Sequence, residues 1–418
     1  MQITILLTMY IGYAGFMLCL NTLIASSVEM IQDPAVELDK ESFGQLMSWH
    51  SAGAIAGKLV TGIGADLIGG RRMFLLALSL TALANVGFAF CSSFLFMGIW
   101  NFLGQFFKAG GWPAMTKIVG VWYPPRRYGQ VWSIISTSSR VGTIAATFLL
   151  GFLLSLISWR AVFVFSAVLT GGIVVAAYFF LKESPKSAGL PPLEKDSSDS
   201  TEPTSERHRL DELSLGQACI AFTRSGRFWL IGFGIFFLTI LMDFINFIPI
   251  YLADTLKVDG GRAAMAAAAF PSGMFAALIA TSFTYDRLSR RQLVWTLGGL
   301  LVLSILSVVV LWNLPRLPIA TPLRLYTAMV VIFIMGFAIS PAYYVPMSVF
   351  AIAFGGKHSG FLVSAIDIFG YSGALLFNFF GGSIAQNYGW PAFLSGLLTI
   401  ATLACLCMTG FLTLDYRA

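Results

Sequence analysis

The sequence predicts an all-α membrane protein with twelve transmembrane helices in two six-helix, pseudo-symmetric halves. Three observations carry this prediction: the composition, the regular succession of apolar segments, and a charged loop that occurs twice. Of the 418 residues, 57% are hydrophobic and only 11% are charged. Soluble domains carry about a quarter charged residues, so the surplus apolar surface is expected to face lipid.

The apolar segments are each about 20 residues or longer, which is the length that crosses a bilayer as a helix. They cover residues 3–28, 44–66, 73–93, 95–122, 128–157, 160–181, 226–253, 262–284, 293–312, 323–353, 358–386 and 390–413. Residues 184–214 are rich in Ser, Pro, Glu and Lys, a composition that cannot bury a core. We therefore expect helical bundles at 1–183 and 215–418, joined by a disordered cytoplasmic linker.

The basic residues predict the orientation of the chain. With both termini in the cytoplasm, the cytoplasmic segments hold 16 lysines and arginines, the opposite side holds six, and four remain within the membrane. This asymmetry follows the positive-inside rule. The first apolar segment begins almost at Met1 and lacks the basic leader of a cleavable signal peptide. We expect a monomeric, multi-pass protein of the cell inner membrane, in contact with lipid.

The sequence offers no chemistry typical of an enzyme. Its five cysteines are scattered, without the spacing of metal ligands or of a disulfide framework. A Walker-type phosphate loop, a nucleophile–base pair and a cofactor loop are all missing from the sequence. We therefore expect no enzymatic activity, no cofactor, no metal site and no nucleic-acid partner.

Two sequence features recur at the same place in each half. The loop after the second apolar segment reads GIGADLIGGRR, and the loop after the eighth reads SFTYDRLSRR. Their aspartates, Asp66 and Asp286, are 220 residues apart. The sixth and twelfth segments begin with SWRAVF and GWPAFL, whose tryptophans are 231 apart. These offsets predict two six-helix repeats joined by a linker.

The charged loops resemble the signature loop of the major facilitator superfamily, whose members share a twelve-helix fold. Its form is Gly-x3-Asp-(Arg/Lys)-x-Gly-x-(Arg/Lys)-(Arg/Lys), and the first copy departs from it at Leu67. The second copy keeps the charges but has Ser282 and Ser289 in place of the glycines. The resemblance implies a conformational latch in which aspartates cap helices and pair with arginines; the alternative is that the charges only set the topology. The latch residues are Gly62, Asp66, Gly69, Arg71, Arg72, Asp286, Arg287, Arg290 and Arg291.

A second resemblance covers the first half. The stretch GQFFKAGGWPAMTKIVGVWYPPRRYGQVWSIISTSSRVGT, followed by SWRAVF and ESPKSAGLPP, is similar to the organophosphate:phosphate antiporter family. That family contains glycerol-3-phosphate and glucose-6-phosphate transporters and a hexose-phosphate sensor. This chain departs from the family at two phosphate-binding positions, which align with apolar Leu20 and Leu238. The departures put phosphate specificity in doubt.

Three basic residues are predicted near the middle of the bilayer. Lys58, Lys108 and Arg140 lie 14, 13 and 12 residues into their segments, roughly 20 Å deep at the rise of an α-helix. Three cations at one level cannot face lipid cheaply, so we expect them to line a water-filled cavity and to bind an anionic substrate. The alternative is that they are structural.

Further charged residues are candidates for coupling or gating. Asp243 and Asp367 lie within the seventh and eleventh segments, where they could take up protons, act as a gate or form structural ion pairs. Lys117 lies nine residues after Lys108, with Gly110, Gly111 and Pro113 between them. These three residues predict a break in the helix, so Lys117 is expected at the cytoplasmic side, separate from the anion site.

The leading hypothesis is a secondary transporter of a small organic anion, either a carboxylate or an organophosphate. It would act by alternating access as an antiporter or symporter, coupled to protons or to a counter-anion. Its expected partners are the small anionic substrate, protons and membrane lipid. The alternative is a membrane sensor that binds an organic anion without transporting it and acts through a partner protein.

Overall fold

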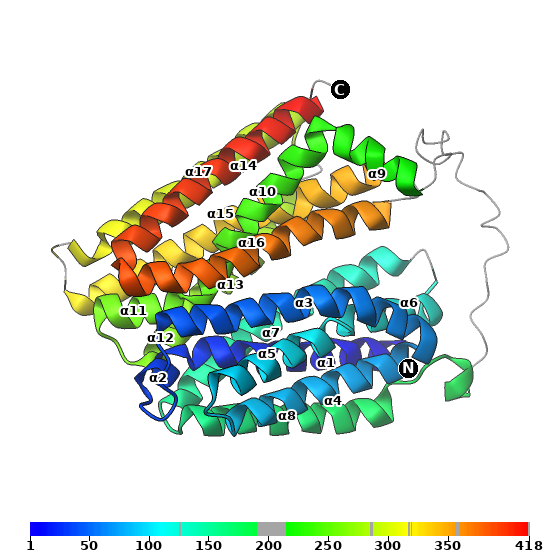
Figure 1. Cartoon of the computed structure of the whole chain (residues 1–418). Helices are drawn as coiled ribbons and strands as arrows, with labels where there is room; N and C mark the ends of the chain where they lie inside the picture. The colour runs from blue at the N-terminus through cyan, green and yellow to red at the C-terminus, as the bar shows by residue number, and fades with distance from the viewer. Residues whose placement is uncertain are drawn as a thin grey trace. The chain divides into compact units, whose positions relative to one another are not determined.

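The structure is a computed structural model, and it describes residues 1–124, 127–189, 215–284, 287–316, 318, 320–355 and 359–416. The described residues form helices and connecting turns (Figure 1). The predicted linker lies mainly outside them, as does Asp286. The surroundings of Gly62 and the side chain of Asp66 are also outside the described part. A helix, α9, begins at Leu215, close to where the second bundle was expected to begin.

The helices of the first part of the chain are α1 (Gln2–Ala25), α2 (Ser27–Gln32), α3 (Lys40–Ile68), α4 (Gly70–Ala89), α5 (Phe94–Lys108), α6 (Gly111–Trp122), α7 (Tyr128–Leu154) and α8 (Trp159–Phe180). The later helices are α9 (Leu215–Arg224), α10 (Gly226–Asp243), α11 (Ile248–Leu256), α12 (Gly260–Ala267), α13 (Ala269–Thr284), α14 (Arg290–Asn313), α15 (Thr321–Gly355), α16 (Ser359–Asn387) and α17 (Gly389–Tyr416). Short 3-10 turns lie between some of them.

Ten helical stretches in the described part of the chain are long and apolar enough to cross a membrane. They account for ten of the twelve predicted segments. The other two correspond to α3, and to α5 with α6. These are the segments that carry Lys58 and Lys108. The second of them is interrupted, so that α5 has 15 residues and α6 has 12.

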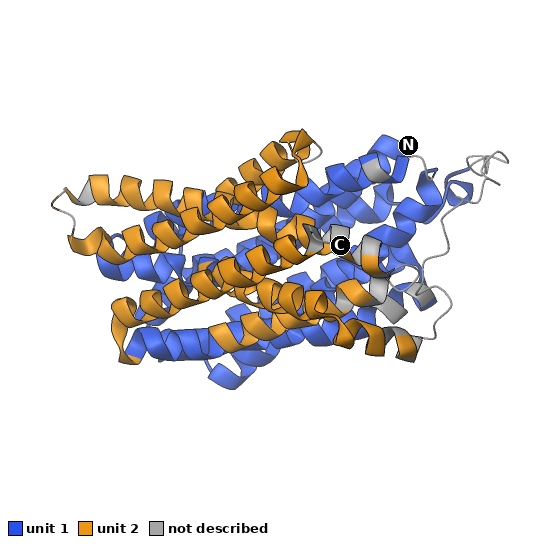
Figure 2. Cartoon of the chain, turned by 90° about the horizontal axis from the view of Figure 1, so that it is seen from above, with its two compact units in different colours: residues 1–195, 245–271, 378–386 blue, residues 196–244, 272–377, 387–418 orange. Residues whose placement is uncertain are grey.

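The chain divides into two compact units, coloured separately in Figure 2. Unit 1 contains residues 1–195, 245–271 and 378–386, and unit 2 contains 196–244, 272–377 and 387–418. Unit 1 thus joins the first eight helices to α11, α12 and the last residues of α16. The units follow spatial contact, whereas the predicted halves at 1–183 and 215–418 follow chain order, and those halves stay a prediction.

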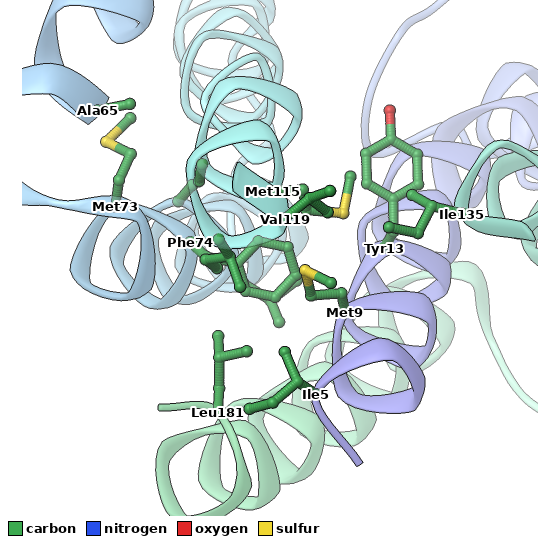
Figure 3. Packing of buried hydrophobic residues seen from close by; sticks show 14 of the residues in the cluster. Ile5, Met9, Tyr13, Ala65, Met73, Phe74, Met115, Val119, Ile135 and Leu181 are labelled. Carbon is green, nitrogen blue, oxygen red and sulfur yellow. The ribbon is translucent and has the colours of Figure 1, made fainter. Parts of the chain in front are cut away.

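An apolar core within unit 1 packs α1, α4, α6 and α7 together. Phe16 from α1 and Phe74 from α4 meet edge to face, with ring centroids 5.8 Å apart. Figure 3 shows part of this cluster from close by, including Met9 of α1, Met115 of α6 and Leu181 at the end of α8. The Tyr13 ring lies at its edge, and its hydroxyl points away from these side chains. The core therefore fixes Tyr13 as one boundary between apolar packing and a polar region.

Close helix crossings in unit 1 depend on glycine. A Cβ added to Gly44 in α3 would clash with the backbone carbonyl of Asn378 in α16, and one added to Gly382 would clash with the carbonyl of Lys40. The same relation joins Gly151 in α7 to Gly261 in α12, where the added Cβ atoms would lie 2.9 and 2.8 Å from the opposite carbonyl oxygen. Small residues of this kind let membrane helices approach at backbone distance.

Candidate functional site

The fourth predicted segment is broken within the stretch that separates its two lysines. Helix α5 ends at Lys108, and α6 begins at Gly111 after an αR turn at Ala109 and Gly110. A Cβ on Gly111 would lie 2.8 Å from the Phe16 ring, so the absence of a side chain lets α6 begin close against α1. The predicted break is confirmed, and it leaves Lys108 at the last turn of its helix.

Helices α3 and α5 run side by side in register. A Cβ on Gly53 would clash with the carbonyl of Phe102, and one on Gly57 would lie 2.5 Å from the carbonyl oxygen of Phe106. The step from Gly53 to Gly57 on α3 thus matches the step from Phe102 to Phe106 on α5. The same register places Lys58 level with residue 107, next to Lys108. This packing agrees with the prediction that the two cations share a level, and their place in a substrate site stays a prediction.

Helices α1 and α7 are also in register. The Tyr10 hydroxyl lies 3.1 Å from Thr137 Oγ1, and a Cβ on Gly142 would lie 2.9 Å from the Ala14 Cα atom. Arg140 therefore lies at the level of Tyr13 on the neighbouring helix. The charges of Arg140 and Lys58 are both close enough to act on the Tyr13 hydroxyl. Tyr13 is thus a residue on which the charges of both α3 and α7 act.

Aromatic side chains extend this polar region. The Trp112 ring meets Tyr13 edge to face at a centroid distance of 5.5 Å, and it lies 5.0 Å from the Trp132 ring at an angle of 37°. Trp112 is 39% exposed, although it is the second residue of a membrane-embedded helix. Flat aromatic faces beside cations can hold the carbon skeleton of a small ligand while the cations hold its anionic group.

The side chains differ in exposure. Lys58 is exposed, while Lys108 and Arg140 are half-buried. Each of the three has at least one interaction with another residue. We call the set Tyr13, Lys58, Lys108, Trp112 and Arg140 the cationic site. In the part of unit 1 that the structure describes, it combines positive charge with aromatic surface.

A buried polar network borders the cationic site. His50 in α3 lies between two side chains of α5: its Nδ1 is 3.3 Å from Asn101 Oδ1, and its Nε2 contacts Gln105 Nε2. Asn101 in turn donates from Nδ2 to the Leu46 carbonyl at 2.6 Å. The charge of Lys108 also acts on His50. These bonds hold α3 against α5 and give His50 a structural role in positioning the lysine helices.

The two positions that depart from the antiporter family are occupied by packing residues. Leu20 is half-buried and packs against the apolar core of unit 1, and it also lines a small cavity with Asn85 and Asn101. Leu238 is fully buried in α10. Both side chains serve packing, whereas Lys58, Lys108 and Arg140 of the cationic site lie on α3, α5 and α7.

The two acidic candidates belong to unit 2 and do not share a level. A Cβ added to Gly373 of α16 would lie 2.7 Å from the Phe236 carbonyl oxygen. A Cβ added to Gly232 of α10 would lie against the Phe369 ring. This register places Asp367 level with about residue 230 of α10, some 13 residues from Asp243, which is about 20 Å along the axis. Both are half-buried and have interactions with other residues.

Lys117 lies apart from the cationic site. A Cβ on Gly70, the first residue of α4, would lie 3.1 Å from Lys117 Cβ. Gly70 belongs to the first charged loop, so Lys117 packs beside that loop. This placement beside the first charged loop separates Lys117 from Lys108 at the end of α5, and their different roles stay a prediction.

The first charged loop is held by a carboxylate that the sequence did not reveal. Glu183 accepts hydrogen bonds from the backbone N–H groups of Gly70 and Arg71, each at 2.9 Å. Arg71 donates from its guanidinium to the carbonyls of Leu181 at 2.5 Å and Tyr178 at 2.6 Å. The start of α4 and the end of α8 are thereby fastened together, since a carboxylate is favoured at a helix N-terminus.

Gly69 makes this arrangement possible. Its φ of 88° and ψ of 157° lie in a region that is essentially restricted to glycine. A Cβ there would lie 2.8 Å from Glu183 Oε1. The glycine of the signature is therefore required by the backbone and by the approach of the carboxylate. Arg72 is exposed.

The second charged loop is capped by its own side chains. Ser289 Oγ accepts from the N–H of Gln292 at 3.4 Å, and Gln292 Oε1 accepts from the N–H of Ser289 at 2.9 Å, which forms a capping box at the start of α14. Serine in place of the family glycine thus supplies the cap directly. Arg287, Arg290 and Arg291 are exposed.

Sequence reasoning missed Glu183 and undervalued the aromatic residues. Glu183 lies between Lys182 and Lys186, directly after the sixth predicted segment, and this position was the available signal. Trp112 and Trp132 are the tryptophans of the GWP and VWS motifs, yet aromatic residues are common in membrane chains. The described residues contain no group of three or more His, Cys, Asp or Glu that could hold a metal ion.

Comparison with known proteins decides the family. A family model described as Major Facilitator Superfamily matches residues 3–323. The chain belongs to the Major Facilitator Superfamily. As a member of this superfamily it is a multi-pass membrane transporter and not an enzyme, as the sequence predicted. The solved structure of a D-xylose-proton symporter has the same fold, with a TM-score of 0.73, 15% identity and 97% of each chain covered.

Two curated relatives of this superfamily member cover nearly its whole length. A probable hexose phosphate transport protein of Chlamydia pneumoniae is 24% identical over 97% of this chain and 90% of the relative. The membrane sensor protein UhpC of Escherichia coli is 23% identical over 98% of this chain and 91% of the relative. These relatives confirm the resemblance to the organophosphate:phosphate antiporter family.

Proposed function

We propose that this chain is a secondary transporter of a small organic anion, and that the anion binds at the cationic site. The proposal rests on two observations: the charges of Arg140 and Lys58 both act on Tyr13, and the packing of α3 on α5 brings Lys108 to the level of Lys58. Cations within membrane-spanning helices are costly unless a counter-charge or water compensates them. An anionic substrate supplies that counter-charge.

The chemistry of the site favours an organophosphate or a carboxylate. The planar guanidinium of Arg140 can bind either group through two parallel hydrogen bonds, and a lysine adds a point charge. The similarity to a probable hexose phosphate transport protein supports a phosphate ester. Trp112 and Tyr13 provide the surface for the carbon skeleton, and their edge-to-face contact gives that surface a fixed shape.

Transport follows from alternating access. In the proposed arrangement, twelve spans in the inner membrane form two halves, and both termini lie in the cytoplasm. The two halves rock about the substrate. The bound anion, with a proton or a counter-anion as the coupled ion, neutralises the cations and lowers the cost of closing the site. Asp243 and Asp367 are the proposed coupling residues, and the charged loops are the proposed latch.

A ligand screen tests the anion specificity. Purified monomeric protein is heated with phosphate esters, mono- and dicarboxylates and sugar acids, each beside its uncharged analogue. A ligand that binds only the folded state raises the melting temperature, so we expect at least one anion to do so while its neutral analogue does not. Equal shifts for anions and neutral analogues would overturn the proposal. Uptake into proteoliposomes loaded with inorganic phosphate, or subjected to a pH gradient, then separates antiport from proton coupling.

A second function, the sensing of an organic anion without transport, is favoured by one observation. The chain resembles a protein named membrane sensor protein UhpC over 98% of its length, and apolar Leu20 stands where the antiporter family binds phosphate. A sensor would bind the anion in the melting experiment yet give no uptake into proteoliposomes. Uptake of the same anion above that of empty vesicles would exclude this alternative.

A further inference from the structure

A break near the end of the first span contains buried oxygens without partners. Helix α1 ends at Ala25 and α2 begins at Ser27, with Ser26 between them. Ser26 and Ser27 are fully buried, and neither hydroxyl has a hydrogen-bond partner. Glu29 Oε2 is also buried without a partner. Unpartnered buried oxygens are rare in folded proteins, and each one calls for an explanation.

The Glu29 carboxylate packs against the start of α12, within unit 1. A Cβ added to Gly260 would lie 2.6 Å from Glu29 Cδ and 2.8 Å from Glu29 Oε2. The carboxyl group therefore occupies the place where another residue would have its side chain. Helix α2 also contacts α11, so Glu29 lies where three helices meet.

The N-terminus of α12 does not need a second carboxylate. Asp259 already caps this helix by accepting from the N–H of Arg262 at 2.9 Å, and its other oxygen lies 3.1 Å from Arg262 Nε. The negative charge of Asp259 also acts on Glu29. A like charge nearby disfavours an ionised carboxylate.

The nearby cations are engaged by other acids. Lys40 Nζ lies 2.6 Å from Asp254 Oδ2, and Arg160 Nη1 lies 3.8 Å from Asp33 Oδ2. Among the described residues Glu29 has no ion pair. Helix α2 contacts α1, α3, α11 and α12. The charged residues at the near ends of these helices and of α8, and in the loops beside them, are Asp33, Lys40, Glu41, Arg160, Asp254, Lys257, Asp259 and Arg262.

We propose that Glu29 binds a proton while α2 is packed against α12, and that loss of this proton favours their separation. A buried ionised oxygen without a donor costs several kcal/mol, and protonation removes that cost. Once the helices separate, water can solvate the ionised carboxylate. The packed arrangement therefore binds the proton more tightly, and by linkage it is favoured at low pH and weakened as pH rises.

A proton fits these oxygens better than a metal cation does. Hard cations such as Ca²⁺ and Mg²⁺ take six or more oxygen ligands, whereas three unpartnered oxygens are present here. A proton needs one oxygen. The site lies on α2 and α12, away from the residues assigned to the substrate, so its test requires no knowledge of the transported anion.

A distance measurement across this contact tests the proposal. Spin labels are placed at Ala35→Cys and Val258→Cys in the full chain, with the native cysteines replaced by serine, in lipid nanodiscs. We expect the distance to lengthen between pH 5.5 and pH 8.5 in the parent, and to stay short at both values in Glu29→Gln. The matched control Glu37→Gln, at an exposed acid of the neighbouring loop, should follow the parent.

A second variant keeps the test decisive if Glu29→Gln does not fold. Asp259→Asn retains a residue that caps helices well but removes the neighbouring charge, so the midpoint of the change should move to lower pH. The proposal is overturned if the parent shows no change with pH, if Glu29→Gln changes as the parent does, or if sodium chloride at constant pH produces the change. It is also overturned if Asp259→Asn leaves the midpoint in place.

Discussion

Lys40 Nζ lies 2.6 Å from Asp254 Oδ2, and this ion pair joins the first residue of α3 to α11 within unit 1. The two residues are far apart in the chain, yet they close the same group of helix ends that contains Glu29 and Gly260. The lysine side chain is 21% exposed and the aspartate 38%. Such a pair is only partly screened by water and is open to a direct test.

Removing either partner of this pair should lower stability by a similar amount. Pairs of this exposure are worth up to about 1 kcal/mol, so Lys40→Ala and Asp254→Ala should each lower the melting temperature slightly. The double variant Lys40→Asp with Asp254→Lys should recover most of the loss. A double-mutant cycle of melting temperatures measures the coupling, and strictly additive losses would contradict the pairing.

Adding a side chain at Gly44 should disrupt the crossing of α3 and α16. The new atom would clash with the Asn378 carbonyl, a backbone group that cannot rotate away. Overpacking costs about 1–3 kcal/mol, so Gly44→Val should lower the melting temperature clearly. Gly396→Val is the matched control, because Gly396 also lies within a helix and an added Cβ there meets no atom within 4 Å. Equal losses in both variants would show that the crossing is not tight.

Charge removal at the cationic site should weaken anion binding selectively. A hydrogen bond to a charged group contributes about 1.5–3 kcal/mol, so Lys58→Gln, Lys108→Gln or Arg140→Asn should raise the Kd for the anion by about 10- to 100-fold. Lys117→Gln is the control, since Lys117 packs beside Gly70 at the first charged loop. The cationic site is wrong if all four variants lose binding equally.

Neutralising Glu183 should loosen the first charged loop. Glu183→Gln removes the carboxylate that accepts from the N–H groups of Gly70 and Arg71. Helix caps contribute about 0.5–2 kcal/mol, and the melting temperature should fall accordingly. Arg72→Gln, at an exposed position of the same loop, should have a smaller effect. A neutral result for Glu183→Gln would assign the fastening to Arg71 alone.

The contact between Asp33 and Trp159 should make stability depend on pH. The N–H of Ala35 and the Trp159 indole, together with Arg160, hold the pKa of Asp33 below its usual range. A lowered pKa in the folded state stabilises the protein above the unfolded value of about 3.9, and this contribution is lost as pH falls through the folded value. Trp159→Phe removes the indole donor, so it should lower the melting temperature more at pH 7 than at pH 3.

Trp229→Phe provides the comparison for that experiment. The Trp229 indole donates to the Thr223 carbonyl at 2.8 Å, and a carbonyl does not titrate. Its loss should therefore cost the same at both pH values. If the cost of Trp159→Phe is also independent of pH, the carboxylate is not the acceptor that matters.

The sequence predicted those features that depend on helical geometry and on charge in lipid. The depth of Lys58, Lys108 and Arg140 followed from a fixed rise per residue, and the packing of α3 on α5 and of α1 on α7 agrees with it. The break between α5 and α6 followed from Gly110, Gly111 and Pro113. These are local properties, so they are readable from one segment at a time.

Features that depend on distant pairing could not be predicted. Glu183 and Gly70 are 113 residues apart in the chain, and no local pattern indicates that one caps the other. The different depths of Asp243 and Asp367 depend on how α10 meets α16. The contact of Glu29 with Gly260 likewise arises only when α2 packs on α12. Tertiary packing decides which of these distant residues meet, and the hydrophobic periodicity of a single sequence does not show it.

The two charged loops are similar in sequence, but the helices that follow them, α4 and α14, are capped in different ways. The first copy needs Gly69 and a carboxylate borrowed from the end of α8, whereas the second carries its cap within itself as Ser289 and Gln292. The copies are therefore not interchangeable parts. A chimera with serine at position 69 would force a side chain into the place of the Glu183 carboxylate. Each copy of the motif therefore has its own structural requirements, and a residue that suits one loop does not suit the other.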